Sequence, residues 1–251
     1  MDSYVDGPIE LRHGDWREAI GSELAGQCDL IIADPPYGQT SLKWDKWMEG
    51  WPTHVVAMAK ASASLWCFGS LKVFMQHSSE FAEWKFAQDL VWRKQNGSGF
   101  HRDRFKRVHE QIVHFYRGKW RDVYNDVPVT IDSTARAVRR KHRPPHMGGI
   151  ASSTYTSIDG GPRLQRSVLE VRNCHGYAIH PTQKPVELAT MLIQCSCPPD
   201  GMVFVPFAGS GTDLLVARML GVRAIGYEVD ERYFAAAVTR LKADRHIGVM
   251  R

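Results

Sequence analysis

The last third of the chain alternates short apolar runs with helical stretches, and this order constrains the fold more than any other feature. The apolar runs at Met202–Val205 and 224–227 have the length and composition of buried strands. Helical periodicity follows them at Thr212–Leu220 and 233–243. A helix after each strand carries the chain back to the edge of the sheet where that strand began, so the next strand runs parallel to it. We therefore expect a doubly wound α/β sheet with helices on both faces.

The same alternation of strands and helices extends through the first half of the chain. Further strands are expected at residues 29–33, 63–68, 89–93 and 111–116, the first two of them buried. Further helices are expected at 47–60, 71–81 and Val186–Ser196, with Pro185 just before the last and well placed for a first-turn proline. Residues 117–177 are different, since they are rich in Gly, Pro, Ser, Arg and Asn and lack periodicity. A long irregular stretch inside a compact domain is usually functional or mobile.

Length and composition are typical of one globular domain. The 251 residues are 43% hydrophobic and 24% charged, which suffices for one core but falls short of two full domains. No run approaches the roughly 18 consecutive apolar residues that cross a bilayer, and no basic segment precedes an apolar one at the start. The five cysteines form no CxxC pair, so neither a disulfide framework nor a zinc site is indicated. We therefore expect a cytoplasmic protein without membrane association.

Positive charge is concentrated in one third of the sequence. The net charge of the chain is +5, but residues 93–172 hold 17 Lys/Arg against 7 Asp/Glu, a net of +10, and the remainder is net −5. Such asymmetry is typical of a segment that faces nucleic-acid phosphates. A solvated loop region with surplus arginine explains the charge alone equally well.

A glycine-rich turn, VFVPFAGSGT, joins the strand at Met202–Val205 to the helix that follows it. Nucleotide-like ligands bind at the carboxyl ends of such strands, and Gly209 and Gly211 would let the backbone approach one closely. Thr212 stands where a P-loop has lysine, so a nucleoside without phosphates fits better than a nucleoside triphosphate. Glu228 follows about twenty residues later and could accept both ribose hydroxyls. An ordinary turn and a surface glutamate are the structural alternatives.

The tetrapeptide Asp34-Pro35-Pro36-Tyr37 follows the strand expected at residues 29–33. Its two prolines make a stiff turn and remove two N–H donors, which leaves carbonyl acceptors beside the Asp34 carboxylate. Acceptors with a tyrosine ring at their edge suit a planar group that bears an NH2. A rigid turn with an N-capping aspartate is the structural alternative.

Three segments together resemble the signature of S-adenosylmethionine-dependent DNA amino-methyltransferases. They are Asp-Pro-Pro-Tyr at 34–37, His-Pro-Thr-Gln-Lys-Pro at 180–185 and Phe-Ala-Gly-Ser-Gly-Thr at 207–212. The tetrapeptide precedes the cofactor motifs, an order similar to the permuted beta class of bacteria and their phages. Residues 11–15 (LRHGD) and Arg107–Tyr116 add shorter matches. The resemblance implies a Rossmann-like, mostly parallel, seven-stranded sheet in a single catalytic domain over residues 1–251.

The resemblance also implies a role for each matching residue. Asp34 and the Pro35 carbonyl would hold the target amine, Pro36 would stiffen the turn, and Tyr37 would stack on a flipped base. Lys184 would pair with the methionine carboxylate of S-adenosylmethionine, and no metal is needed. The residues expected to bind this cofactor are Asp15, Thr182, Lys184, Phe207, Gly209, Ser210, Gly211, Thr212 and Glu228.

One position departs from the family's pattern. An aspartate usually precedes Pro-Phe in the glycine-loop motif, and here that position is Val205. A carboxylate there would help to hold the cationic methionine end of the cofactor. Asp213 or Asp15 could supply the missing acid.

The basic middle, residues 94–172, would then be an inserted target-recognition region that binds double-stranded DNA. Asp-Pro-Pro-Tyr favours adenine N6 as the methyl acceptor, because cytosine-N4 enzymes more often have Ser in place of Asp. Cytosine-N4 methylation and a non-catalytic DNA-binding module derived from a methylase remain alternatives, and a homodimer is possible. The candidate DNA contacts are Lys94, Arg102, Arg104, Lys106, Arg107, Arg139, Arg140, Lys141 and Arg143.

Overall fold

The computed structural model describes residues 2–98, 102–139, 154–174 and 176–244. Its main element is a sheet in which nine described strands pair. In spatial order they are β1 (Ser3–Asp6), β2 (Ile9–His13), β13 (Arg223–Glu228), β12 (Met202–Val205), β3 (Cys28–Ala33), β4 (Ala59–Gly69), β6 (Arg107–Tyr116), β5 (Lys85–Ser98) and β11 (Val168–Glu170). The predicted α/β fold with a mostly parallel sheet is confirmed, but the prediction of seven strands is wrong.

Two short edge strands account for the difference in strand number. β1 folds back antiparallel on β2 through a turn in which Gly7 has a positive φ of 57°. β11 pairs parallel with β5 over only three residues. A three-residue strand is too short to show the period-two alternation by which strands are recognised in a sequence.

The strand directions determine where the motifs meet. β2, β13, β12, β3 and β4 are successive neighbours and pair parallel, whereas β6 pairs antiparallel with both β4 and β5. The carboxyl ends of the parallel strands therefore lie at one edge of the sheet. That edge carries Asp34 after β3, the glycine-rich turn after β12 and Glu228 at the end of β13.

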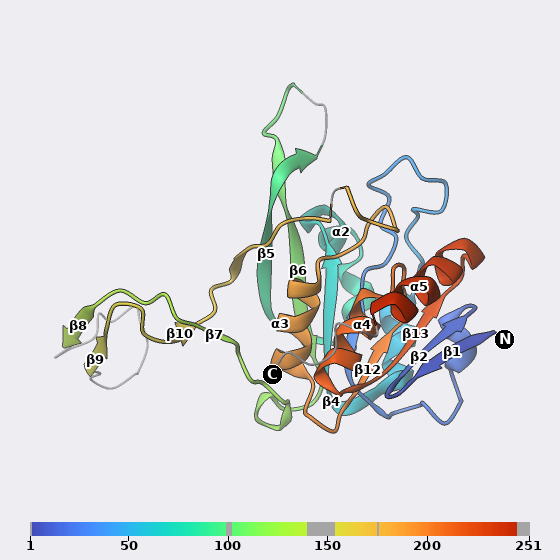
Figure 1. The fold of residues 1–251 in the computed structure, drawn as a ribbon, viewed down its shortest axis with the longest axis horizontal. Coiled ribbons are helices and arrows are strands. Elements are labelled where there is room, and N and C mark those ends of the chain that lie inside the picture. Colours follow the sequence, from blue (N-terminus) through green and yellow to red (C-terminus); the bar gives the residue numbers. More distant parts are fainter. Residues whose placement is uncertain (1, 99–101, 140–153, 175, 245–251) are drawn as a thin grey trace. The chain divides into compact units, whose positions relative to one another are not determined.

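Helical elements cover both faces of the sheet. One face packs against α3 (Val186–Ser196), α4 (Thr212–Leu220) and α5 (Glu231–Ala243), which lie side by side in Figure 1. Alternate residues of β3 face opposite ways: Leu30 and Ile32 belong to that core, and Ile31 and Ala33 to the other. The other core includes residues of η1 (Trp16–Ala19), α1 (Trp51–His54), η2 (Val55–Met58) and η3 (Ser78–Phe81).

Most elements begin and end within a few residues of their predicted positions. β12, α3 and α4 have the predicted bounds, and the helix expected at 71–81 is divided into α2 (Leu71–Gln76) and η3. The helix predicted at 47–60 is wrong, because the chain makes only α1 and η2 before β4 begins at Ala59. Val55 and Met58 are fully buried there, so tertiary packing outweighs helix propensity. Pro185 stands just before α3, as expected, and is its extended N-cap residue (ψ 144°).

The chain divides into two compact units. The larger comprises Met1–Asp126 and Ser167–Arg251 and includes the nine-stranded sheet and the short turn η4 (Trp120–Asp122). The smaller, Val127–Arg166, contains two antiparallel pairs. They are β7 (Val129–Thr130) with β10 (Arg163–Leu164), and β8 (Arg136–Arg139) with β9 (Thr154–Ser157).

The described ranges contain neither a membrane-spanning helix nor a cluster of metal ligands. No helix among them has the length and hydropathy of a membrane span. No group of His, Cys, Asp or Glu side chains within the same ranges is arranged to hold a metal ion. The five cysteines are buried and unpaired with one another.

Candidate active site

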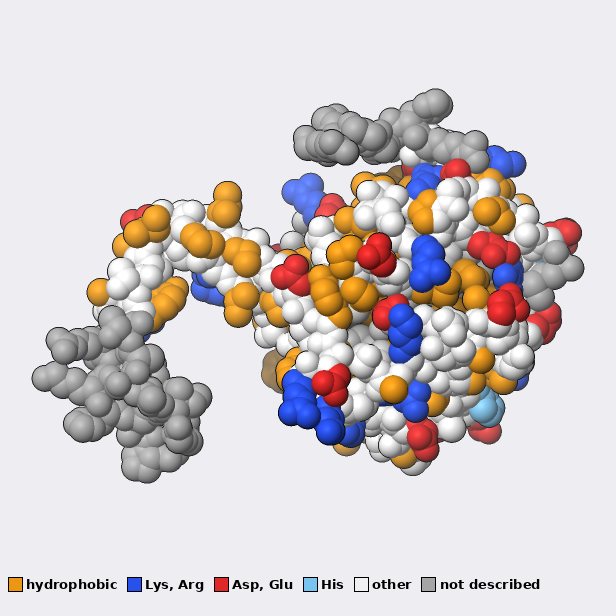
Figure 2. Space-filling view, turned by 90° about the horizontal axis from the view of Figure 1, so that it is seen from below, with side chains coloured by type: hydrophobic (Ala, Val, Ile, Leu, Met, Phe, Trp, Pro, Cys, Tyr) orange, Lys and Arg blue, Asp and Glu red, His pale blue; other side chains and the backbone are white. Residues whose placement is uncertain are grey.

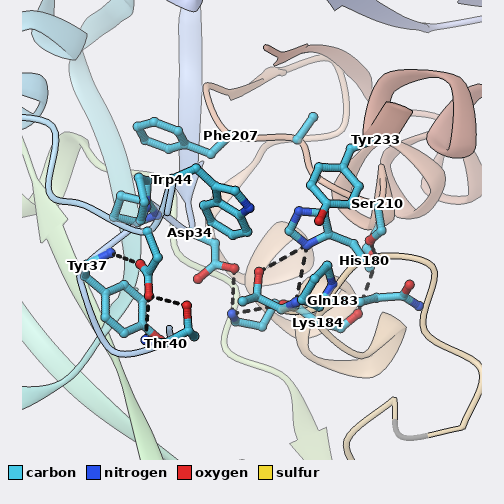
Figure 3. A pocket seen from close by; sticks show the side chains of 18 of the residues that line it. Asp34, Tyr37, Thr40, Trp44, His180, Gln183, Lys184, Phe207, Ser210 and Tyr233 are labelled. Carbon is cyan, nitrogen blue, oxygen red and sulfur yellow. Dashed lines mark hydrogen bonds and ion pairs between the residues drawn. The ribbon is translucent and has the colours of Figure 1, made fainter. Parts of the chain in front are cut away.

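A cavity of about 910 Å³ lies at the carboxyl edge of the parallel strands. Its lining comes from the turns after β2, β3, β12 and β13, from the β5–β6 hairpin and from residues 173, 174, 178 and 180–184, all in the larger unit. Figure 3 shows Asp34 and Lys184 pointing toward one another in this cavity, with Tyr37, His180 and Tyr233 around them. The volume is at the upper end of the usual range for small-molecule sites.

Four charged side chains alternate in sign across the cavity floor. Lys184 Nζ lies 2.6 Å from Asp34 Oδ2 and 3.9 Å from Glu110 Oε2, and Lys94 Nζ lies 3.0 Å from Glu110 Oε1. Lys184 and Glu110 are buried. The other oxygen of Asp34, Oδ1, is buried without a hydrogen-bond partner among the described residues. Asp34 therefore keeps one acceptor for a donor outside the protein.

Burial and these neighbours shift the pKa values of the cluster. Burial raises the pKa of Asp34, the Lys184 ammonium opposes this rise, and Glu110 adds to it. Burial acts to lower the pKa of Lys184, but Asp34 and Glu110 outweigh it, and the pKa is raised. Burial acts to raise the pKa of Glu110, yet Lys184 and Lys94 bring that pKa below its usual value. The cluster thus favours a protonated Lys184 and an ionised Glu110 at neutral pH.

The loop after the tetrapeptide is organised by Asp45, a buried carboxylate that sequence reasoning did not single out. Its Oδ1 accepts the backbone N–H groups of Tyr37 (2.8 Å) and Gly38 (2.9 Å), and its Oδ2 accepts those of Gln39 (2.9 Å) and Thr40 (2.7 Å). Four backbone N–H donors on one carboxylate hold the loop in a fixed conformation. No local pattern predicts this role, because the contacts depend on how the loop closes.

The Tyr37 ring is fixed from its other end. Its hydroxyl donates to Glu110 Oε1 at 2.7 Å, and burial followed by the Glu110 charge raises the Tyr37 pKa well above its usual value. Sequence reasoning also missed Glu110. The available signal was an acidic residue inside the apolar strand at Arg107–Tyr116, since a buried charge needs partners.

The glycine-rich turn and Glu228 form one hydrogen-bonded unit. Glu228 Oε2 accepts from the Gly209 N–H at 2.8 Å, and Oε1 accepts from the Asp230 N–H at 2.9 Å. Burial raises the pKa of Glu228. Gly209 has a positive φ of 51°, and a Cβ there would lie 3.5 Å from the His180 ring. A side chain at Gly209 would therefore be strained and would fill part of the cavity.

Ser210, Gly211 and Thr212 have mainly structural contacts. Arg240 Nη1 donates to Ser210 Oγ (3.2 Å) and to Thr212 Oγ1 (2.8 Å), although both residues also line the cavity. Gly211 does not line it; a Cβ at Gly211 would meet the Ala237 Cβ of α5 at 3.5 Å. Gly211 therefore packs against α5 and does not face the cavity.

Val205 stands where the family usually has an aspartate, and other acidic residues line the cavity. Val205 is buried in the core, whereas Asp213, in the first turn of α4, lines the cavity. Burial, followed by the charge of Asp34, raises the pKa of Asp213 to about 7. Asp15 also lines the cavity, but it caps η1 and pairs with Arg17 at 2.5 Å, which lowers its pKa. Asp15 is thus already neutralised by a neighbouring cation.

Aromatic rings and the 180–185 motif make up another wall of the cavity. The centroid of the His180 ring lies 4.2 Å from that of the Tyr233 ring and 5.7 Å from that of the Trp44 ring. Its Nδ1 accepts from the Thr182 N–H at 3.3 Å, and burial lowers the His180 pKa to about 4. Phe207 lies on the same cavity and packs edge-on against Trp51.

The candidate DNA contacts lie in different parts of the chain. Lys94, Lys106 and Arg107 line the cavity, although Lys94 is engaged with Glu110. Arg102 and Arg104 are exposed near the tip of the β5–β6 hairpin, where Arg104 pairs with Asp103. Arg139 ends β8 in the smaller unit, and Arg140, Lys141 and Arg143 lie outside the described residues.

Comparison with known proteins gives a consistent set of relatives. The DNA methylase family N6_N4_Mtase matches residues 28–239. The Type II methyltransferase M.ScaI of Streptomyces caespitosus is 25% identical over 96% of this chain and 84% of its own length. The solved M1.HpyAVI–SAM complex (TM-score 0.64, 22% identity) covers 92% of this chain and 99% of its own. The cytosine-N4-specific PvuII DNA methyltransferase (TM-score 0.66, 16% identity) covers 98% and 95%.

The family match extends over most of the chain and includes the strand before Asp34, the 180–185 motif and the glycine-rich turn. Members of this family depend on S-adenosylmethionine. The chain therefore belongs to the N6/N4 DNA methylase family and is an S-adenosylmethionine-dependent DNA methyltransferase.

Proposed function

We propose that this chain is a site-specific methyltransferase for the exocyclic N6 amine of an adenine turned out of double-stranded DNA. The observation that carries the proposal is the state of Asp34: Lys184 holds Oδ2, and Oδ1 is without a partner among the described residues. An amino group has two hydrogens and needs two acceptors. Asp34 Oδ1 and the Pro35 carbonyl supply them at the cavity, beside the Tyr37 ring.

The cavity also suits the cofactor. Each oxygen of Glu228 accepts one backbone N–H and retains lone pairs for ribose hydroxyls. Gly209 leaves the space that a Cβ would fill, so the backbone can approach the ligand closely. S-adenosylmethionine supplies, when bound, a methyl group on a positively charged sulfur. Asp213 offers the carboxylate that Val205 lacks for the cationic methionine end.

The chemical contribution of the protein is to position and polarise the amine. An exocyclic amine is a poor nucleophile, because its lone pair is delocalised into the base. Hydrogen bonds from its N–H groups to Asp34 and Pro35 favour a pyramidal nitrogen and aim the lone pair at the methyl group. Lys184 favours the ionised form of Asp34, which is the form that accepts.

Tyr37 and the basic residues hold the base and its strand. Because Glu110 and Asp45 fix both ends of Tyr37, its ring is ready to stack on a planar base. Turning a base out of the duplex costs a few kcal/mol. Phosphate contacts from residues 94–172, the proposed target-recognition region, would offset part of that cost.

The substitution Asp34→Ala tests the proposal. We expect methyl transfer to fall to background while affinity for DNA is retained, because the variant loses the acceptor for the target amine and the ion pair with Lys184. Asp200→Ala, at an exposed acid in the turn before β12, is the matched control and should keep full activity. Wild-type turnover by Asp34→Ala would contradict the proposed mechanism.

Mapping modified bases after expression in methylation-free cells tests the choice of base. N6-methyladenine at one short sequence is expected. N4-methylcytosine would overturn the adenine assignment and leave the family intact. A protein that neither modifies DNA nor binds S-adenosylmethionine at equilibrium would be the non-catalytic module instead.

A further inference from the structure

Phe105 is the most exposed large apolar side chain among the described residues. Its relative exposure is 101%, at the end of the β5–β6 hairpin, which extends beyond the rest of the sheet in Figure 1. Phe86, at the other end of the same strand pair, is 61% exposed but still packs edge-on against Phe115. Phe105 has no ring contact of this kind within the described ranges. One exposed ring does not by itself indicate a partner, so the inference rests on the charges around Phe105 and on its attachment to the cavity.

The surroundings of Phe105 are strongly basic. Arg102, Arg104, Lys106 and Arg107 lie within three residues of it, against one acid, Asp103, which is paired with Arg104 at 2.6 Å. A polyanion is therefore a better partner for this tip than an apolar protein groove or a lipid chain.

The hairpin is attached to the catalytic loop. Arg107 donates to Gln39, two residues after Tyr37, and Glu110 of β6 accepts from the Tyr37 hydroxyl at 2.7 Å. Asn96, Gly97 and Lys106, on both sides of the hairpin, line the cavity itself. Phe105 is thus the immediate chain neighbour of Lys106, which lines the space where the target base would enter.

We propose that Phe105 inserts into the base stack of the bound duplex and fills the gap that the flipped base leaves. The inference rests on the proposed function, since it requires a base turned into the cavity. Apolar side chains placed between base steps are a known means of stabilising unstacked DNA. Burial of the ring against neighbouring bases removes its apolar surface from water, and the flanking cations meet the phosphates on either side.

The test compares two substrates that differ only in the cost of flipping. Both are duplexes with the mapped methylation site; in one the target base is paired, and in the other it faces an abasic position. For Phe105→Ala we expect methylation of the paired duplex to fall by about tenfold or more, because the extrahelical state loses its support. Methylation of the abasic duplex should stay near the wild-type rate. Phe105→Trp should retain activity on both, and Phe86→Ala is the matched control for loss of an exposed phenyl ring.

Several outcomes would overturn the inference. They are an unchanged rate of Phe105→Ala on the paired duplex, an equal loss on both duplexes, and an altered oligomeric state of the variant, which would assign the ring to a contact between copies. If the wild-type protein methylates neither duplex, the proposed function fails and this inference fails with it. Unchanged S-adenosylmethionine affinity of Phe105→Ala confirms that the variant is folded.

Discussion

Lys184 lies between two carboxylates, with Nζ 2.6 Å from Asp34 and 3.9 Å from Glu110. The resemblance in sequence implied a contact with the methionine carboxylate of the cofactor, whereas the structure gives this side chain a partner inside the protein. A motif predicts which residue type is needed at a position. It does not predict Glu110 on β6 as a neighbour, because that contact is formed only when the sheet brings two distant segments together.

The substitution Lys184→Met tests which contact matters. Without the ammonium, Asp34 is left mainly with the influences that raise its pKa, burial foremost, so it ionises at higher pH. The acidic limb of the pH–rate profile for methylation should therefore move to higher pH. Lys94→Met, which removes a cation paired with Glu110, should move it less. An unshifted limb combined with a raised KM for S-adenosylmethionine would instead favour the methionine carboxylate as partner.

Asp213 gives a second prediction at a single residue. Its pKa of about 7 means that the carboxylate form, which we propose attracts the cationic end of S-adenosylmethionine, is lost as the pH falls through 7. Affinity should therefore weaken about tenfold between pH 8 and pH 6 in the wild-type protein, and Asp213→Asn should be weak at both. Calorimetric titration measures both trends.

A relocation of the acid provides the control for Asp213. The double variant Val205→Asp/Asp213→Asn returns a carboxylate to the family's usual position and should recover affinity. Equal affinity of Asp213→Asn and the wild-type protein at pH 8 would show that the cofactor is held without this acid.

Sequence reasoning located the helices and strands whose local residue pattern is strong. α3 and α4 show clear helical periodicity, β12 is a short apolar run, and all three have the predicted bounds. The helix predicted at 47–60 failed because burial of Val55 and Met58 against the sheet decides its path. The position of the tetrapeptide and of the glycine-rich turn at the cavity edge was predictable, since each follows a strand end. The carboxylates that hold Tyr37 and the loop after it, Glu110 and Asp45, were not predictable, because their partners are distant in sequence or depend on loop closure.

His114 on β6 is a buried titratable group, and its shifted pKa predicts how folding stability depends on pH. His114 is fully buried, stacks on Trp66 with 4.1 Å between ring centroids, and accepts or donates one hydrogen bond to Ser64 at 3.0 Å. Burial lowers its pKa to about 4. An unfolded chain binds the proton at about pH 6.5, so folding stability falls as the pH drops from 6.5 toward 4. We expect this residue to cost about 2 kcal/mol of unfolding free energy between pH 7 and pH 5.

The variant His114→Gln isolates this contribution. Glutamine can retain a hydrogen bond to Ser64 but does not titrate in this range. Urea unfolding at pH 7 and pH 5 should show a smaller decrease in stability for the variant than for the wild-type protein. Parallel decreases in the two proteins would assign the acid sensitivity to other groups.

At the scale of the whole molecule, net positive charge is confined to one compact unit. Val127–Arg166 contains 7 Lys/Arg and 2 Asp/Glu, a net of +5, which equals the net charge of the entire chain. The larger unit is accordingly neutral overall, and the face of it seen in Figure 2 has acidic and basic side chains interspersed. The cavity belongs to the larger unit alone. We therefore expect cofactor binding and long-range attraction for DNA to reside in different units of this chain.

Replacement of Val127–Arg166 by a Gly/Ser linker of equal length tests that separation. The sheet, including β11 against β5, lies outside the replaced segment, so the variant should fold and bind S-adenosylmethionine with wild-type affinity. Its affinity for DNA should fall, and the slope of log affinity against log salt should become shallower by about 0.9 for each phosphate that the variant no longer neutralises. A second variant has a linker of equal length in which the same seven basic residues are restored, so it separates the effect of charge from that of structure. If this variant recovers affinity for DNA but not methylation at the mapped site, site recognition depends on the folded form of Val127–Arg166. Unchanged DNA affinity and salt slope in the uncharged variant would instead place the phosphate contacts on the larger unit, with the β5–β6 hairpin as their remaining basic segment.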